Sequence, residues 1–135
     1  MNANSPVLLV VKREKNSELL DELLQENGYS VQAAASFHEA ETALSKTTEV
    51  SVVILDLDGF TTDILSQIRD FATNGIPLVL VSRSIDGPRN QLSQLRTVEF
   101  LEKPLKKQEL LHTVRRTVEL APPANSREEV QNDDR

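Results

Sequence analysis

The sequence predicts an α/β fold in which one doubly wound parallel sheet of five strands has helices on both faces. Three observations support this prediction. Five short apolar runs recur along the chain, each is followed by a segment with helical spacing of apolar residues, and turn-forming residues separate the two. A strand that is buried on both faces is a continuous apolar run, and repeated strand–helix units form parallel sheets. The 135 residues are enough for one domain.

The apolar runs are expected to be the strands. The first run is continuous, and the third gives the strongest signal because five of its six residues are apolar. Gly28 precedes the second run and Pro77 precedes the fourth, as is typical where a turn leads into a strand. The predicted strands are 7–11, 29–34, 50–55, 78–81 and 98–101.

Helical spacing predicts five helices between and after these strands. The first contains the leucines at 19–24, with Asn16 or Ser17 as its N-cap and Gly28 after its last turn. The second opens at a capping box formed by Ser36 and Glu39. The remaining helices are expected after Thr61 or Thr62, at 90–96 and at 106–120.

Two polar segments flank the predicted domain, which spans 7–120. Residues 1–6 are expected to be a polar arm. Residues 121–135 lack apolar periodicity, and we expect them to be a disordered tail or a linker.

Composition excludes several classes of function. The net charge of −6 argues against nucleic-acid binding by the folded part. The absence of cysteine excludes disulfides, thiolate metal sites and thiol nucleophiles. No run approaches the roughly 18 apolar residues of a membrane span, and the N-terminus has no signal-peptide pattern. We therefore expect a cytoplasmic domain that binds neither nucleic acid nor membrane.

Chemically active side chains follow four of the predicted strands. The carboxyl ends of parallel strands lie along the same edge of a sheet, so these side chains are expected to converge. A carboxylate can accept a phosphoryl group, and a hydroxyl and an ammonium can hold the transferred oxygens. The residues are Lys12, Arg13 and Glu14 after the first strand, Asp56 after the third, Ser82 after the fourth and Lys103 after the fifth.

Over residues 6–120 the chain resembles the receiver domains of bacterial response regulators. Five stretches match in the right order: 7–11, 28–31, 52–56, 76–82 and 100–104. The resemblance implies a flavodoxin-like sheet and a non-enzymatic signalling module of a two-component or phosphorelay system. It also implies that Asp56 is the phosphoacceptor, Ser82 the switch hydroxyl, Lys103 the pocket lysine and Phe100 the aromatic residue whose rotamer reports activation.

The chain departs from the family where metal binding is concerned. Lys12 and Arg13 stand where the family has two acidic residues that help to bind Mg²⁺. Together with Asp56 and Lys103 they give these positions a formal charge of +2. Mg²⁺ is normally held by carboxylates and water. At about 4 Å and an effective dielectric near 20, each added like charge costs roughly 4 kcal/mol before screening.

We therefore expect weak or no Mg²⁺ binding and no cofactor, with Lys12 or Arg13 paired to Asp56 in the place of the metal. Glu14 and Asp58 are weak candidates for metal ligands, since they could restore negative charge to the pocket. The leading hypothesis is an atypical receiver that binds a protein partner, a histidine kinase or a downstream signalling protein, through the face of its fourth helix, fifth strand and fifth helix. Pairing with a second copy is left open.

Two alternatives remain at this stage. In the first, a histidine kinase phosphorylates Asp56, and Glu14 or Asp58 helps to hold the metal. In the second, residues 56–61 are the first motif of a haloacid-dehalogenase-like phosphohydrolase, in which the first Asp is the nucleophile and Asp58 a general acid or base. That motif usually lies on the first strand, whereas two strand–helix units precede it here.

Overall fold

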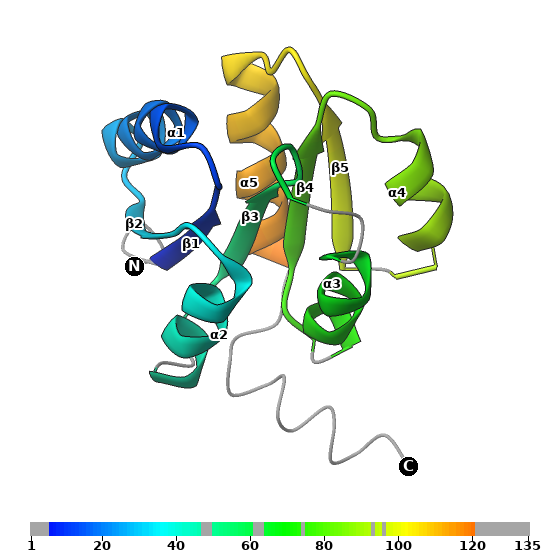
Figure 1. The fold of residues 1–135 in the computed structure, drawn as a ribbon. Helices are drawn as coiled ribbons and strands as arrows, with labels where there is room; N and C mark the ends of the chain where they lie inside the picture. The colour runs from blue at the N-terminus through cyan, green and yellow to red at the C-terminus, as the bar shows by residue number, and fades with distance from the viewer. Residues whose placement is uncertain are drawn as a thin grey trace.

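A parallel five-stranded sheet lies between two layers of helices in the computed structural model (Figure 1), which describes residues 6–46, 50–60, 64–73, 75–92, 94–95 and 97–120. The strand order is β2-β1-β3-β4-β5, with every neighbouring pair parallel. The strands are β1 (Pro6–Val10), β2 (Ser30–Ala34), β3 (Val52–Asp56), β4 (Leu78–Ser82) and β5 (Val98–Glu102). The predicted fold class is confirmed.

The helices cover both faces of the sheet, and one follows each strand. They are α1 (Glu14–Glu26), α2 (Phe37–Lys46), α3 (Ile64–Thr73), α4 (Asp86–Leu92) and α5 (Lys107–Leu120). Helices α1 and α5 pack on one face, and α2, α3 and α4 pack on the other, as Figure 1 shows. Within the described residues, no helix combines the length and the apolar character needed to cross a membrane.

Alternation along the strands divides the core into two apolar layers. Successive side chains of a strand point to opposite faces, so each buried strand contributes to both layers. This explains why β3 and β4 are almost wholly apolar and buried along their length. On the side of α1 and α5 the strand residues include Val7, Leu9, Ile54 and Val81, and on the other side Leu8, Val10, Leu55 and Leu80.

The predicted starts of two helices were wrong. Helix α1 begins at Glu14, with Arg13 as its N-cap, rather than after Asn16 or Ser17. Arg13 has an extended backbone, and the carboxylate of Glu14 lies in the first turn, where the helix dipole favours it. Helix α4 begins at Asp86 rather than near residue 90.

The early start of α4 brings a proline into the helix, before the predicted start near residue 90. Pro88 lies in the first helical turn, where a missing backbone N–H breaks no helical hydrogen bond. Pro6, which we expected in the polar arm, is the first residue of β1, another position where proline is tolerated.

The Ser36 half of the predicted capping box at α2 is confirmed, whereas the Glu39 side chain binds one residue before the N-cap. The Ser36 hydroxyl accepts the backbone N–H of Glu39 at 3.1 Å, and the Glu39 carboxylate accepts the N–H of Ala35 at 2.9 Å. The expected start of the third helix at Thr61 or Thr62 lies outside the described residues.

The carboxyl ends of the central strands meet at one edge of the sheet. Asp56 is in register with Val81, and Ser82 is in register with Glu102. The strand order also reverses between β1 and β3, because the chain moves outward from β1 to β2 and then returns to β3. Such a reversal point is where open α/β sheets place their sites.

Candidate functional site

Asp56 is a buried carboxylate at the end of the central strand β3, with only 1% of its side chain exposed. Its Oδ2 atom accepts a hydrogen bond from the Lys103 ammonium at 2.8 Å. Its Oδ1 atom accepts the backbone N–H of Asp58 at 3.0 Å. Because a buried polar group without partners is costly, these two donors offset the burial of the Asp56 carboxylate.

A tight turn after β3 returns the chain toward the pocket. The bond from Asp58 N–H to the Asp56 side chain closes an Asx turn, and Phe60 N–H donates to the Leu57 carbonyl at 3.1 Å. Gly59 has φ +97°, as the third residue of a type II turn requires. A Cβ atom on Gly59 would also lie 3.2 Å from the Cβ of Lys12. The local sequence Asp-Leu-Asp-Gly therefore determines the path of this loop.

This turn brings Asp58 into the site. Its carboxylate receives the Lys103 ammonium at 2.9 Å, the Ser82 hydroxyl at 3.2 Å and the backbone N–H of Arg83 at 3.2 Å. The Nε atom of Arg83 lies 3.6 Å from the same carboxylate. Asp58 thus joins the β3–α3 loop to the ends of β4 and β5.

These contacts shift the pKa values of the two groups that share the ion pair. Burial raises the pKa of Asp58, but the bonds from Lys103, Ser82 and Arg83 outweigh it, so the pKa lies below its ordinary value. Burial lowers the pKa of Lys103, but Asp56 and Asp58 outweigh it, so that pKa lies above its ordinary value. Both groups are therefore charged at neutral pH.

Two positively charged side chains lie against the two carboxylates of the pocket. Asp56 and Asp58 supply two negative charges, while Lys103 contacts both carboxylates and the guanidinium of Arg83 lies beside Asp58. In the part of the chain that the structure describes, no three His, Cys, Asp or Glu side chains are grouped so that they could hold a metal ion.

Lys12 and Arg13 do not occupy the place that we expected. Both side chains are exposed, and among the described residues the ion pair of Asp56 is with Lys103, so the expected pairing with Lys12 or Arg13 is wrong. The Lys12 ammonium lies 5.8 Å from the centre of the Phe60 ring, where a cation–π interaction is favourable. Lys12 therefore packs along the loop that carries Asp58 and does not neutralise the pocket.

The other predicted residues divide between the pocket and its surroundings. Ser82 and Lys103 lie in the site, and the Lys103–Pro104 peptide bond is cis. Glu14 is exposed at the start of α1. Phe100 is half-buried on β5, with the guanidinium carbon of Arg89 5.7 Å from the centre of its ring.

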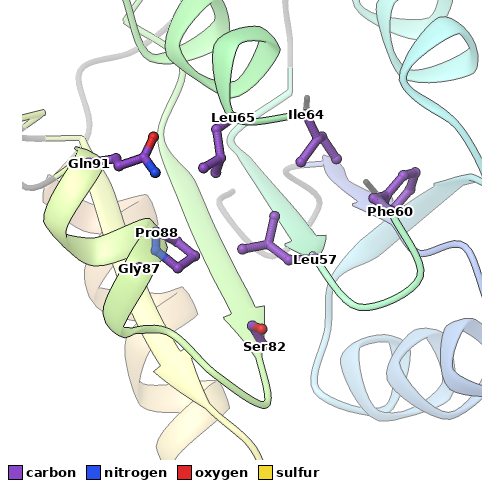
Figure 2. Close-up of a pocket in the computed structure, with 8 residues that line it drawn as sticks. All are labelled: Leu57, Phe60, Ile64, Leu65, Ser82, Gly87, Pro88 and Gln91. Carbon is purple, nitrogen blue, oxygen red and sulfur yellow. The ribbon is translucent and has the colours of Figure 1, made fainter. Parts of the chain in front are cut away.

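Two hollows adjoin the site. Figure 2 shows the first, about 190 Å³, in which Ser82 at the end of β4 faces apolar side chains that include Leu57 and Ile64. The second, about 380 Å³, is lined by Asp56 and Lys103 together with leucines of α1 that include Leu19. The ion pair of Asp56 and Lys103 therefore borders one hollow, and the hydroxyl of Ser82 borders the other.

Sequence reasoning missed the central place of Asp58 and the backbone contact from Arg83. The signal for Asp58 was present, since an Asp two residues after a strand-ending Asp and before a glycine is typical of consecutive tight turns. The contact from Arg83 has no such signal, because it is made by a backbone N–H that any residue except proline supplies.

The fold and the pocket together define a class of signalling domain, with an acidic residue at a strand end beside a hydroxyl and a lysine. The chain matches the family described as "Response regulator receiver domain" over residues 7–115. It belongs to this family. Asp56 therefore lies on the third strand because the receiver fold places it there, whereas the phosphohydrolase motif would lie on the first.

Solved structures show the same architecture. The response regulator TrrA from Thermotoga maritima, in complex with Mg²⁺ and BeF, is 26% identical with a TM-score of 0.68, covering 84% of this chain and 98% of its own. The receiver domain of a sensor histidine kinase from Pseudomonas aeruginosa, with magnesium in its active-site cleft, is 21% identical with a TM-score of 0.73, covering 86% and 98%.

A structure from Rhodopirellula baltica described as an adenylate cyclase is 19% identical, with a TM-score of 0.76, and covers 96% of this chain and 98% of its own. A comparison with curated protein sequences gave no match. The structural similarities establish the receiver architecture and the family match establishes the class.

Proposed function

We propose that this receiver domain acts by binding a protein partner, with weak or no Mg²⁺-dependent phosphorylation of Asp56. The observation that carries the proposal is the charge balance of the pocket. Lys103 contacts both Asp56 and Asp58, and Arg83 lies beside Asp58, so the carboxylates are already neutralised by side chains of the chain itself.

The donor set does not suit Mg²⁺. This ion prefers octahedral coordination by oxygen and gives up its water reluctantly, so it needs carboxylates that are free to face it. Here Asp56 accepts from Lys103 and from a backbone N–H, and Asp58 accepts from three groups. The positions of the family's acidic pair are Lys12 and Arg13, so they supply no carboxylate to a dication.

The surface that we expect to meet the partner is built by α4, β5 and α5, by analogy with the family. On this surface the Arg89 guanidinium lies over the ring of Phe100, and Arg116 pairs with Glu99 at 2.8 Å. A histidine kinase or a downstream signalling protein is the expected class of partner.

Nuclear magnetic resonance of the ¹⁵N-labelled domain tests the proposal. We expect Mg²⁺ with beryllofluoride, a phosphoryl analogue, to leave the amide resonances of Asp56, Ser82 and Lys103 unchanged. Large saturable shifts at these amides would show a conventional pocket and contradict the proposal.

The second candidate is a response regulator that a histidine kinase phosphorylates on Asp56. It is favoured by the position of Asp56 at the end of β3, beside Lys103 and the hydroxyl-bearing Ser82. Phosphate-affinity electrophoresis of the domain after incubation with a kinase, beside Asp56→Asn as the control, separates the two. A retarded band that is lost in the variant supports this second candidate.

A further inference from the structure

Three donors from the ends of β4 and β5 converge on one carboxylate that the family pattern does not account for. Asp58 Oδ2 lies 2.9 Å from the ammonium of Lys103 and 3.2 Å from the backbone nitrogen of Arg83, and Oδ1 lies 3.2 Å from the hydroxyl of Ser82. An ammonium and a hydroxyl are the groups expected to hold transferred oxygens in this pocket. In this chain they hold a side chain instead.

We propose that the Asp58 carboxylate is an intramolecular ligand that occupies the anion site of the pocket. It keeps Ser82 and Lys103 in an anion-bound arrangement without a phosphoryl group. This role rests on the proposed function, in which side chains of the chain itself close the pocket. When Asp58 is absent, the site is expected to accept a small carboxylate or a tetrahedral oxyanion.

The backbone positions Asp58 for this role. The Asx turn to Asp56 and the left-handed conformation of Gly59 direct the loop over the pocket, and only 14% of the Asp58 side chain is exposed. Phe60 follows Gly59 in the chain, and its ring packs edge to face on Phe37 with the ring centres 6.2 Å apart. The carboxylate is therefore held in the site by the path of the chain on both sides.

Ser82 has a second acceptor, which makes its hydroxyl sensitive to the occupant of the anion site. The hydroxyl oxygen lies 3.2 Å from Asp58 Oδ1 and also 3.2 Å from the carbonyl oxygen of Ser84. One proton cannot serve both acceptors fully. With the anion in place the hydroxyl can turn to Asp58, and without it the hydroxyl can turn to Ser84, which alters the segment that leads to α4.

The test is chemical rescue of Asp58→Ala in the absence of Mg²⁺, followed through the amide resonances of Ser82, Arg83 and Ser84. The variant keeps the backbone N–H that donates to Asp56. We expect these resonances to move in the variant and to return toward their wild-type positions, saturably, as sodium formate is added. The variant should bind formate at least about tenfold more tightly than the wild type, because a hydrogen bond to a charged group contributes on that scale.

Matched controls separate site occupancy from general effects. Sodium chloride at equal ionic strength should not return the resonances, and Asp70→Ala, which removes an exposed carboxylate of α3, should not respond to formate. If formate leaves Asp58→Ala unchanged, or moves Asp70→Ala equally, the proposal is wrong.

Asp58→Asn provides a second variant in case the alanine form does not fold. Its neutral amide has a single acceptor oxygen, whereas Ser82 and Arg83 donate to different oxygens of Asp58, so it can keep only one of these bonds in full and cannot form the ion pair with Lys103. We therefore expect the same amides to shift and formate to return them only in part. Resonances that coincide with the wild type would overturn the proposal. The formate experiment contains no Mg²⁺, so its outcome is independent of the beryllofluoride experiment that tests the proposed function. Either experiment can fail while the other gives the expected result.

Discussion

Replacing Lys103 with methionine removes the ammonium that joins Asp56 to Asp58 and keeps a side chain of similar length. In the wild type this ammonium lies 2.8 Å from one carboxylate and 2.9 Å from the other. Without it, the nearly inaccessible Asp56 retains only the backbone N–H of Asp58 as a donor among the contacts described above. Asp58 retains Ser82 and Arg83.

The expected loss of stability follows from the burial of these groups. Breaking a buried ion pair costs about 3–5 kcal/mol, because the remaining charge is left uncompensated. The Lys103 side chain is 20% exposed and Arg83 remains beside Asp58, so we expect the lower end, about 3 kcal/mol. Against a total stability of about 5–15 kcal/mol this is a large fraction.

Urea unfolding at pH 7 measures the effect. Lys103→Met should lose about 3 kcal/mol, and Lys15→Met, which removes an exposed lysine of α1, should change stability by no more than about 0.5 kcal/mol. Adding Asp56→Asn to Lys103→Met should restore much of the loss, since it removes the uncompensated charge.

The pH dependence of Lys103→Met provides an internal check. Without the ammonium, burial still raises the pKa of Asp58, while the contacts with Lys103 that lower that pKa most are lost. The stability that Asp58 contributes above its unfolded pKa should therefore be smaller in the variant, and the loss of stability as the pH falls through the folded pKa should be shallower than in the wild type. A variant that matches the wild type in stability at pH 7 would refute the reasoning that this ion pair holds the pocket together.

Four further predictions concern the pocket, its loop and the core. Because the pKa of Asp58 is lowered, its contribution to stability should be complete above the unfolded value of about 3.9 and fall as the pH drops through the lower folded value. The urea midpoint of Asp58→Asn should therefore depend less on pH in this range than the midpoint of the wild type, and an equal dependence would contradict this. Because the pKa of Lys103 is raised, its contribution should be complete below about 10.4 and be lost as the pH rises through the higher folded value, and the same decline in Lys103→Met would count against it. Gly59→Ala should cost about 1–2 kcal/mol in urea unfolding, while Gly87→Ala, which meets no atom within 4 Å, should not destabilise; equal effects would exclude the backbone explanation. Leu80→Ala should cost about 2–5 kcal/mol by leaving a cavity in the central strand, and a calorimetric loss below that range would indicate that the core collapses around it.

The fold could be predicted from the sequence because the central strands are buried on both faces. The run at Val52–Asp56 is apolar up to its last residue, a pattern typical of a parallel strand that is covered on both faces. Element ends were harder to predict. The start of α1 has no side-chain cap, and α4 accommodates Gly87 and Pro88 in its first turn, so neither boundary follows the usual residue preferences.

The site could be predicted only where strand ends determine it. Asp56, Ser82 and Lys103 were found because the sheet brings their positions to one edge. The direction of Lys12 depends on the ring of Phe60, which belongs to a loop after another strand. Asp58 reaches the pocket because the chain reverses direction at Gly59. The charge of a residue in the sequence does not reveal where its side chain points.

Calorimetric titration of Mg²⁺ into the wild type and into the double variant Lys12→Asp/Arg13→Asp tests the central claim most directly. The variant restores the acidic pair of the family and provides the positive control. We expect no saturable heat from the wild type at millimolar Mg²⁺ and measurable binding by the variant. Saturable binding by the wild type that is lost in Asp56→Asn would contradict the claim that the pocket is neutralised by its own side chains.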